Sequence, residues 1–237
     1  RENMEDVVME RKFDTAKIGA STFVHSMKNQ LLSSRVIYKR IDQLYEQPEL
    51  DTGKLKEYID TLRTVNDAML LRMEELYRCV KTKSIFMVPV EISDLVKDTL
   101  ERFHGKYPEV TILVENAGVE RILADKVQLG EALYNLLVNA QEAVLSADKG
   151  EKGEVSLKIR NERLYTVIEV RDNGCGMAKH QIKKIFEPFY SSKNSNSNWG
   201  MGLYYVREIV KSHLGFMRVD STEGEGSCFY ILLPKYQ

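Results

Sequence analysis

The first third of the chain carries apolar residues at helical intervals and has no strand-like alternation of apolar and polar positions. One such run extends from Phe23 to Leu44 and a second from Leu55 to Val80. Between them, the segment Gln47 to Gly53 (QPELDTG) has the proline, glycine and acidic residues that are typical of a turn. The pattern predicts two amphipathic helices that form an antiparallel hairpin.

A two-helix hairpin with this many apolar positions cannot bury them all by itself. We therefore predict that it pairs with a second copy of the chain to form a four-helix bundle. The near-heptad spacing of the second helix favours the same arrangement. Residues 1–86 are assigned to this dimerising unit.

After a connector at Ser84 to Pro89, residues 87–237 mix helical and strand-like periods. Asp125 is placed to cap a long helix that reaches about Ala147, with Gln128 as the reciprocal partner of a capping box. Further helices are expected at Ile92 to Phe103, Lys179 to Ile185 and Leu203 to His213, and strands at Val110 to Glu115, Val155 to Ile159, Leu164 to Val170, Phe216 to Ser221 and Ser227 to Leu233. The predicted fold class is α+β: the helical hairpin, then a two-layer α/β sandwich with helices on one face of a mixed sheet.

Composition removes several classes of function. With 34 basic and 35 acidic residues, the net charge of -1 gives no electrostatic footprint for nucleic acid. Cys79, Cys175 and Cys228 lie far apart in the sequence, which argues against a disulfide scaffold and fits a reducing, cytoplasmic setting. No apolar run reaches the roughly 18 residues of a membrane span. The chain opens at Arg1 rather than Met, which is compatible with a fragment whose missing part is membrane-bound.

Short motifs in the C-terminal two-thirds carry the candidate chemistry. They read NLLVNA from Asn135, DNGCGM from Asp172, FEPF from Phe186 and GMGL from Gly200. Asn139, in the first motif, puts a carboxamide on a mostly apolar helix. Its oxygen can satisfy a backbone group, or it can ligate a hard cation such as Mg²⁺.

The acidic and glycine positions of these motifs also allow two interpretations. Asp172 follows a strand, so its carboxylate can accept a hydrogen bond from an exocyclic amine, or it can form an Asx turn within its own loop. Gly174 and Gly176 let the backbone approach a ligand closely. Gly200 and Gly202 precede a helix and could direct backbone amides at a phosphate, although glycine is also common in ordinary turns.

Together with GEGSCF at Gly224 to Phe229, the motifs resemble the N, G1, F, G2 and G3 boxes of sensor histidine kinases, in order, over roughly Val90 to Leu233. The resemblance implies the Bergerat (GHKL) ATP-binding fold, with ATP and Mg²⁺ as cofactors. It implies Asn139 as the magnesium ligand and Asp172 as the carboxylate that reads adenine. The remaining nucleotide-binding positions that it implies are Gly174, Gly176, Phe186, Phe189, Lys193, Gly200, Gly202 and Leu203.

Asn135 distinguishes this chain from other ATPases with the same pocket. In gyrase, mismatch-repair and heat-shock chaperone relatives, a general-base glutamate lies one helical turn before the magnesium asparagine, and Asn135 occupies that position here. An amide cannot take a proton from attacking water as a carboxylate does. We therefore expect little hydrolysis and transfer of the phosphate to a residue of the protein.

The chain has four histidines, and His25 is the candidate phosphate acceptor. A histidine in such a helix is usually solvated or packed, but VHSMKNQLL around His25 resembles the H box of the same kinases. A neutral imidazole nitrogen can attack a phosphoryl group. His104 and His180 are expected at the surface, and His213 is expected to cap or pack the last helix.

The H box departs from the family pattern at two positions. Ser26 stands where most such boxes carry an acidic residue, and Gln30 stands where many carry proline. Asn29 and Gln30 each match an amide position that, in different subfamilies, positions water for dephosphorylating the response regulator.

The resemblance implies a homodimeric kinase that autophosphorylates His25 and passes the phosphate to the receiver domain of a response regulator. Three alternatives stay open: a non-catalytic ATP-binding scaffold, which Ser26 motivates; a kinase that works mainly as a phosphatase; and a serine kinase of the anti-sigma type, which would lack the N-terminal helices.

Overall fold

The computed structural model describes residues 24–25, 27–80, 85–147, 153–188, 190 and 200–236. The chain divides into two compact units. One contains Arg1–Lys81 with Pro188–Met201, and the other contains Thr82–Glu187 with Gly202–Gln237. No helix among the described residues is long and apolar enough to cross a membrane.

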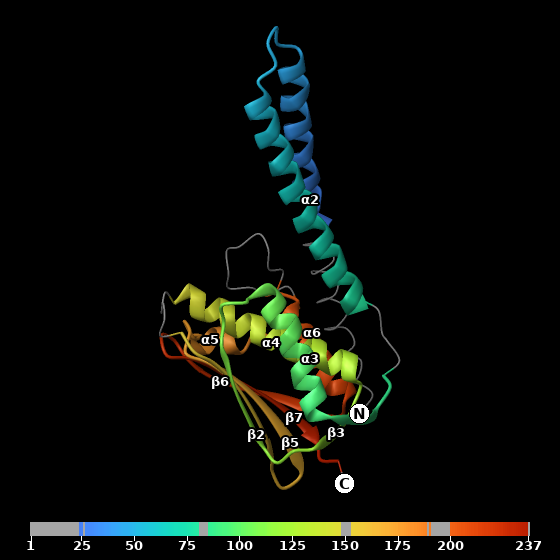
Figure 1. Cartoon of the computed structure of the whole chain (residues 1–237), viewed down its shortest axis with the longest axis vertical. Helices are drawn as coiled ribbons and strands as arrows, with labels where there is room; N and C mark the ends of the chain where they lie inside the picture. The colour runs from blue at the N-terminus through green and yellow to red at the C-terminus, as the bar shows by residue number, and fades with distance from the viewer. Residues whose placement is uncertain are drawn as a thin grey trace, which may run out of the picture. The chain divides into compact units, whose positions relative to one another are not determined.

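The first unit contains two long helices, one at residues 27–45 and α2 at Thr52–Val80. They lie side by side and are joined by a short turn (Figure 1). Asp51 begins α2 by accepting a hydrogen bond from the Lys54 backbone N–H at 2.9 Å, which satisfies one of the free donors of the first turn. Ile37, Leu44 and Leu62 are buried within this unit.

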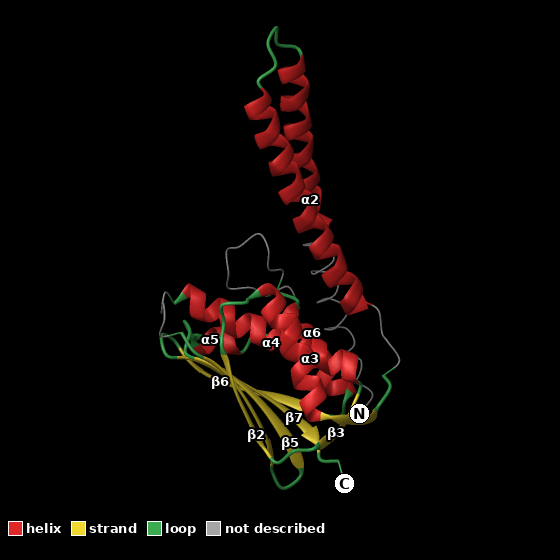
Figure 2. Cartoon of the chain, in the orientation of Figure 1, coloured by secondary structure: helices red, strands yellow, loops and turns green. Residues whose placement is uncertain are grey.

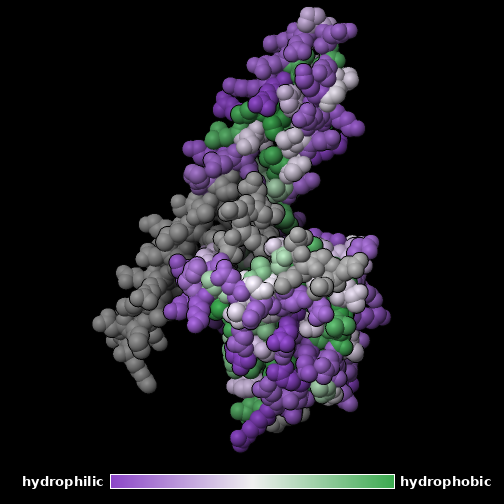
Figure 3. All heavy atoms as spheres, turned by 90° about the vertical axis from the view of Figure 1, so that its left-hand side faces the viewer, coloured by the Kyte–Doolittle hydropathy of each residue, from purple (hydrophilic) through white to green (hydrophobic). Residues whose placement is uncertain are grey.

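Many apolar side chains of these helices are nevertheless on the surface. Figure 3 shows hydrophobic residues among hydrophilic ones along this part of the chain. The exposed apolar residues of the helices include Leu31, Leu32, Val36, Tyr38, Ile59, Leu70, Leu71 and Met73. Exposed apolar surface of this extent is a common mark of an interaction surface.

The second unit is built on a five-stranded mixed sheet. Its strands are β2 (Ile112–Ala117), β4 (Val155–Asn161), β5 (Tyr165–Asp172), β7 (Gly226–Pro234) and β6 (Phe216–Thr222), in the spatial order β2-β4-β5-β7-β6. Strand β2 is parallel to β4 and the other pairs are antiparallel. A separate antiparallel pair joins β1 (Val88–Glu91) to β3 (Arg121–Ala124).

Helices α3 (Ile92–Lys106), α4 (Lys126–Ser146) and α6 (Gly202–Ser212) cover one face of this sheet (Figure 2), and the short α5 spans Lys179–Ile182. The two-layer arrangement that the periodicity predicts is confirmed for this unit. The core lies between the layers. Its fully buried side chains include Leu133, Leu136 and Leu137 of α4, and Ile159, Ile168 and Ile231 of the strands.

The opposite face of the sheet carries charged pairs. Lys158 lies 2.9 Å from Glu115, and Arg160 lies 2.7 Å from Glu169. These pairs join neighbouring strands across the β2–β4 and β4–β5 ladders. Because alternate residues of a strand point to opposite faces, the same strands supply apolar side chains to the core and charged ones to water.

Candidate functional site

Helix α4 positions the two asparagines of the first motif. Asn135 donates a hydrogen bond from its side chain to the Glu131 carbonyl oxygen at 2.8 Å. A β-carbon on Gly202 would lie 3.5 Å from Oδ1 of Asn135, so the start of α6 lies directly against this residue. Asn139 follows four residues later on the same face of α4 and is half-buried. Among the described residues, none forms a hydrogen bond with the Asn139 amide, which leaves its oxygen able to bind a ligand.

Asp172 ends strand β5 and is buried, with 5% of its surface exposed. Its Oδ1 accepts a hydrogen bond from the Gly174 backbone N–H at 2.8 Å. This is the Asx turn that the sequence allows. A carboxylate offers about four acceptor positions, so the turn is compatible with a second, ligand-reading role.

The loop that follows Asp172 is pressed against the end of α4. A β-carbon on Gly174 would lie only 2.4 Å from the Ala143 carbonyl carbon. The Cys175 backbone N–H donates to the Ala143 carbonyl oxygen at 3.1 Å. Glycine is therefore required at residue 174 for close approach of two backbones of the protein itself.

The turn between β6 and β7 holds the same loop from its other side. Gly176 has a φ of 63°, and a β-carbon there would lie 1.9 Å from the Thr222 carbonyl oxygen. The Gly224 N–H donates to the Cys175 carbonyl oxygen at 2.7 Å. The G1 loop is thus held between α4 and the turn that joins β6 to β7. Because the G3 motif begins in that turn, it supports the conformation of the G1 loop.

Phe186 of the F motif is half-buried, and the Arg207 guanidinium lies 5.8 Å from the centre of its ring. Sequence reasoning missed Arg207, since nothing local links α6 to a residue 21 positions earlier. Gly200 has a φ of 68°, a conformation that favours glycine. Leu203 lies in the first turn of α6. Phe189 and Lys193 lie outside the described residues.

The start of α4 requires a correction. Asp125 caps the helix as predicted, because Oδ1 accepts from the Gln128 N–H at 3.0 Å. The reciprocal half of the capping box is wrong: the Gln128 side chain donates to Oδ2 of Asp125 at 3.2 Å instead of accepting from its backbone N–H. That N–H donates to Nε2 of His213 at 2.9 Å.

The other histidines differ in their surroundings. His213 is fully buried, in agreement with the capping or packing role expected for it. His180 is exposed, as predicted. His104 is not a free surface residue, because it is half-buried and Nε2 lies 3.0 Å from the Val110 carbonyl oxygen.

His25 lies on the exposed surface of the first unit. The side-chain nitrogen of Asn29, one turn later, lies 3.4 Å from Nδ1 of the ring. Gln30 is half-buried, and its Oε1 has no hydrogen-bond partner among the described residues. Ser26 lies outside the described residues.

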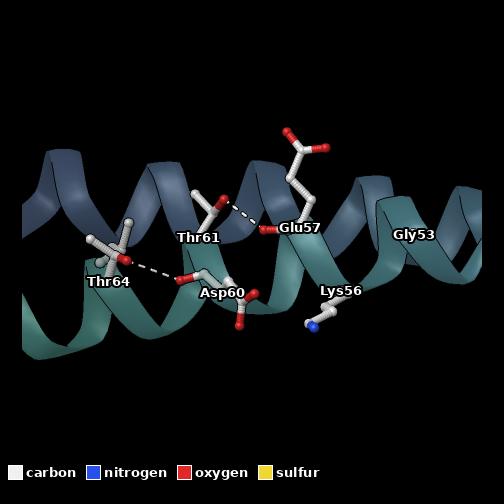
Figure 4. Close-up of a pocket in the computed structure, with 7 residues that line it drawn as sticks. Gly53, Lys56, Glu57, Asp60, Thr61 and Thr64 are labelled. Carbon is white, nitrogen blue, oxygen red and sulfur yellow. Dashed lines mark hydrogen bonds between the residues drawn. The ribbon is translucent and has the colours of Figure 1, made fainter.

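A shallow hollow on α2 does not belong to the candidate site. Figure 4 shows its lining residues, which include Lys56 and Glu57. The Thr61 hydroxyl donates to the Glu57 carbonyl oxygen at 2.8 Å, and the Thr64 hydroxyl donates to the Asp60 carbonyl oxygen at 3.0 Å. Because these hydroxyls are bonded within the helix, the hollow reads as an ordinary solvated helix face.

The donor set around Asn139 fits magnesium only together with a nucleotide. Within the described part of the chain, no group of three or more His, Cys, Asp or Glu residues could hold a metal ion. Magnesium is commonly bound by one or two protein oxygens plus substrate phosphates. One amide oxygen, on the helix whose Asn135 lies against the start of α6, meets that requirement if a nucleotide supplies the phosphates.

Comparison with known proteins gives the family. Residues 124–237 match the domain family described as histidine kinase-, DNA gyrase B-, and HSP90-like ATPase. Sensor histidine kinase ZraS of Salmonella typhimurium is 27% identical over 232 residues, which cover 95% of this chain and 48% of that protein. Sporulation kinase C of Bacillus subtilis is 28% identical over 183 residues, which cover 76% of this chain and 41% of that protein. The chain spans about half the length of these curated relatives.

Solved structures share the fold. The catalytic domain of histidine kinase ThkA matches with a TM-score of 0.55 and 24% identity, over 63% of this chain and 96% of that chain. ThkA in complex with response regulator protein TrrA matches with a TM-score of 0.69 and 19% identity, over 96% of this chain and 64% of that chain. Residues 124–237 therefore form a GHKL-type domain of the histidine kinase-, DNA gyrase B-, and HSP90-like ATPase family, and the chain is similar to sensor histidine kinases over most of its length.

Proposed function

We propose that this chain binds ATP with Mg²⁺, phosphorylates its own His25 and passes the phosphate to an aspartate on the receiver domain of a response regulator. The observation that carries the proposal is the amide at Asn135, whose nitrogen is bonded to the Glu131 carbonyl. Residue 135 offers no carboxylate that could take a proton from an attacking water, so hydrolysis of ATP lacks its usual general base. The exposed imidazole of His25 offers the phosphoryl group another acceptor.

Each residue of the pocket has a role in this proposal. Asp172 reads the adenine amine, and Asn139 contributes an oxygen to Mg²⁺, which neutralises phosphate charge when bound. Gly200 and Gly202 bring the start of α6 to the phosphates. Phe186, Phe189, Lys193 and Leu203 complete the nucleotide-binding set taken from the family motifs.

The chemical step needs a lone pair on one imidazole nitrogen. That nitrogen attacks the terminal phosphorus of ATP, an N–P bond forms, and the bond to the bridging oxygen breaks with its electron pair to release ADP. The proton on the other ring nitrogen can pass to water, because His25 is exposed. Positioning of the two reactants supplies most of the catalysis in such reactions.

Assembly and location belong to the same proposal. The exposed apolar residues of the first unit support a homodimer in which two hairpins form a four-helix bundle. Residues 1–86 would then dimerise and carry the histidine, and residues 87–237 would bind ATP. ThkA was solved in complex with a response regulator, which supports a similar partner for this chain in the cytoplasm.

The test is incubation of the chain with Mg²⁺ and γ-labelled ATP. The proposal expects a phosphoprotein that is stable in base and labile in acid, as phosphohistidine is. Measurable ATP binding with no label on the protein would instead support the non-catalytic scaffold.

A second activity, dephosphorylation of the response regulator, is favoured by the Asn29 amide at the ring of His25. An amide there can orient an attacking water. Asn29→Ala and Gln30→Ala would be compared for the rate at which a phosphorylated receiver domain loses its phosphate. A rate unchanged in both variants would remove this activity from the account.

A further inference from the structure

His213 directly follows α6, and both of its ring nitrogens are engaged. Nδ1 lies 2.8 Å from the Ile209 carbonyl oxygen, one turn back in the same helix. Nε2 accepts from the Asp125 backbone N–H at 2.9 Å. A carbonyl only accepts and an N–H only donates, so both bonds form together only when Nδ1 carries the proton and Nε2 does not. The buried ring is therefore held as one neutral tautomer.

Asp125 joins three parts of the second unit. Its backbone N–H reaches α6 through His213, and its Oδ1 caps α4 through the Gln128 N–H. Its Oδ2 accepts from the Phe86 N–H at 3.2 Å, in the segment before β1. Burial alone would raise the pKa of the Asp125 carboxyl, but the hydrogen bonds from Gln128 and Phe86 outweigh it and lower the pKa. The carboxylate is thus stabilised in the ionised form that accepts all of these bonds.

Two contacts mark the ends of the packing between α4 and α6. One is the hydrogen bond between Asp125 and His213. At the other end Gly202 lies against Asn135, where the nucleotide motifs meet. Asp125 precedes Asn135 by 10 residues, or about 15 Å of helix at 1.5 Å per residue. Gly202 precedes His213 by 11 residues, or about 16 Å. The two contacts are therefore separated by similar distances along the two antiparallel helices, so each lies at one end of the packing between α4 and α6.

We propose that His213 is a positioning residue for the nucleotide site, which fixes α6 to the capped start of α4 and so sets where Gly202 meets Asn135. This inference rests on the proposed ATP-binding function. Loss of the Asp125 contact would free the end of α6 to slide along α4. Because a helix moves as a rigid body, its start would then shift relative to Asn135 and Asn139, although His213 lies at the opposite end of α6.

Two substitutions separate the two bonds of the ring. In His213→Gln the side-chain oxygen can reach the place of Nε2, so the bond from the Asp125 N–H can be kept. In His213→Asn the shorter amide reaches only the place of Nδ1, so the bond to the Ile209 carbonyl can be kept and the contact between helices is lost. Both variants remove the ring, which makes each the control for lost packing in the other.

The expected result is a difference in Mg²⁺-ATP affinity, measured by calorimetry on the full 237-residue chain. We expect His213→Gln to stay within about threefold of wild type, and His213→Asn to raise the Kd about tenfold, or about 1.4 kcal/mol. Equal affinities in the two variants, or the reverse order, would overturn the positioning role.

Hydrogen exchange without nucleotide separates this inference from the function on which it rests. Faster exchange at the amide of residue 125 and in the first turn of α6 is expected in His213→Asn and not in His213→Gln. If wild type bound no ATP, the proposed function would fail, and exchange would still decide whether His213 ties the helices. If hydrogen exchange instead became faster by the same amount throughout the second unit in both variants, His213 would contribute only packing and would not position α6.

Discussion

His25 and His213 have the same side chain in opposite surroundings. His25 is exposed on a helix of the first unit, with the Asn29 side chain 3.4 Å from one ring nitrogen. His213 is fully buried at the end of α6, and protein groups engage both of its nitrogens. A ring with both nitrogens bonded cannot attack a phosphorus atom. Surroundings, and not residue type, therefore separate the candidate acceptor from the positioning residue.

Cys175 and Cys228, the two cysteines whose side chains the structure describes, repeat this contrast. Cys175 is exposed in the G1 loop, whereas Cys228 is buried in β7. Burial raises the pKa of the Cys228 thiol to about 11, so it stays protonated at neutral pH. The exposed member of each pair is available for chemistry and the buried member contributes to the structure.

Chemical modification would show the contrast with the largest effect. We expect diethylpyrocarbonate to modify His25 and His180 at least about a hundredfold faster than His213, since His213 becomes accessible only when the unit opens. Mass spectrometry of peptides at increasing times measures the rates. Similar rates for His213 and His25 would break the comparison.

The clasp around the G1 loop gives the next largest effect. Gly176→Ala places a β-carbon 1.9 Å from the Thr222 carbonyl oxygen, so the loop must move. We expect ATP affinity to fall about thirtyfold, or about 2 kcal/mol, because the Asp172 carboxylate moves with the loop. Titration with a fluorescent ATP analogue measures this loss.

Gly224→Ala is the matched control for the clasp. Gly224 also has a positive φ, 81°, but a β-carbon there meets no atom within 4 Å. The variant should carry only the conformational cost of about 1–2 kcal/mol in stability and bind ATP within about threefold of wild type. Equal losses of affinity in the two variants would show that contact with Thr222 is unimportant.

The buried thiol predicts a moderate dependence of stability on pH. The folded-state pKa of Cys228, about 11, exceeds the ordinary value of 9.0, so the unfolded chain releases this proton first as pH rises. The stability that the protonated Cys228 thiol gives the folded state is fully present below pH 9 and is lost between pH 9 and pH 11. A rise of about two pKa units, each worth about 1.4 kcal/mol, sets an upper limit of about 3 kcal/mol on the loss of stability in this range.

Urea unfolding at several pH values measures this slope, and Cys228→Ala isolates the thiol. The neighbouring Cys228 side chain raises the pKa of Tyr230 to about 12, so Tyr230 adds a slope of its own. The difference between wild type and variant should therefore fall from pH 9 to pH 11. A difference in unfolding free energy that stays constant from pH 9 to pH 11 would contradict the raised pKa of Cys228.

Asn29 is expected to have the smallest effect. Its contact with His25 is long and exposed, so Asn29→Ala should slow phosphorylation of the chain only about two- to threefold. ATP affinity should not change. A Kd that changes with the rate would place Asn29 in nucleotide binding instead of at the acceptor.

Local sequence patterns predicted the helices, strands and one helix cap, but they could not predict contacts between residues that are far apart in the chain. The cap at Asp125 is predictable because its partner Gln128 is three residues away. Its second partner, His213, is 88 positions later, and only the fold brings the two together. Similarly, Gly176 was expected to make room for a ligand, but the neighbour that requires glycine is the backbone of Thr222, at the end of β6 and far along the chain.

The most direct test is phosphorylation of four chains side by side with Mg²⁺ and γ-labelled ATP: wild type, His25→Gln, His180→Gln and Asn139→Ala. His180 is the matched control, because it is an exposed histidine outside the proposed reaction. We expect base-stable, acid-labile label on wild type and His180→Gln, and none on His25→Gln or Asn139→Ala. Label on His25→Gln equal to that on wild type would show that His25 is not the phosphate acceptor.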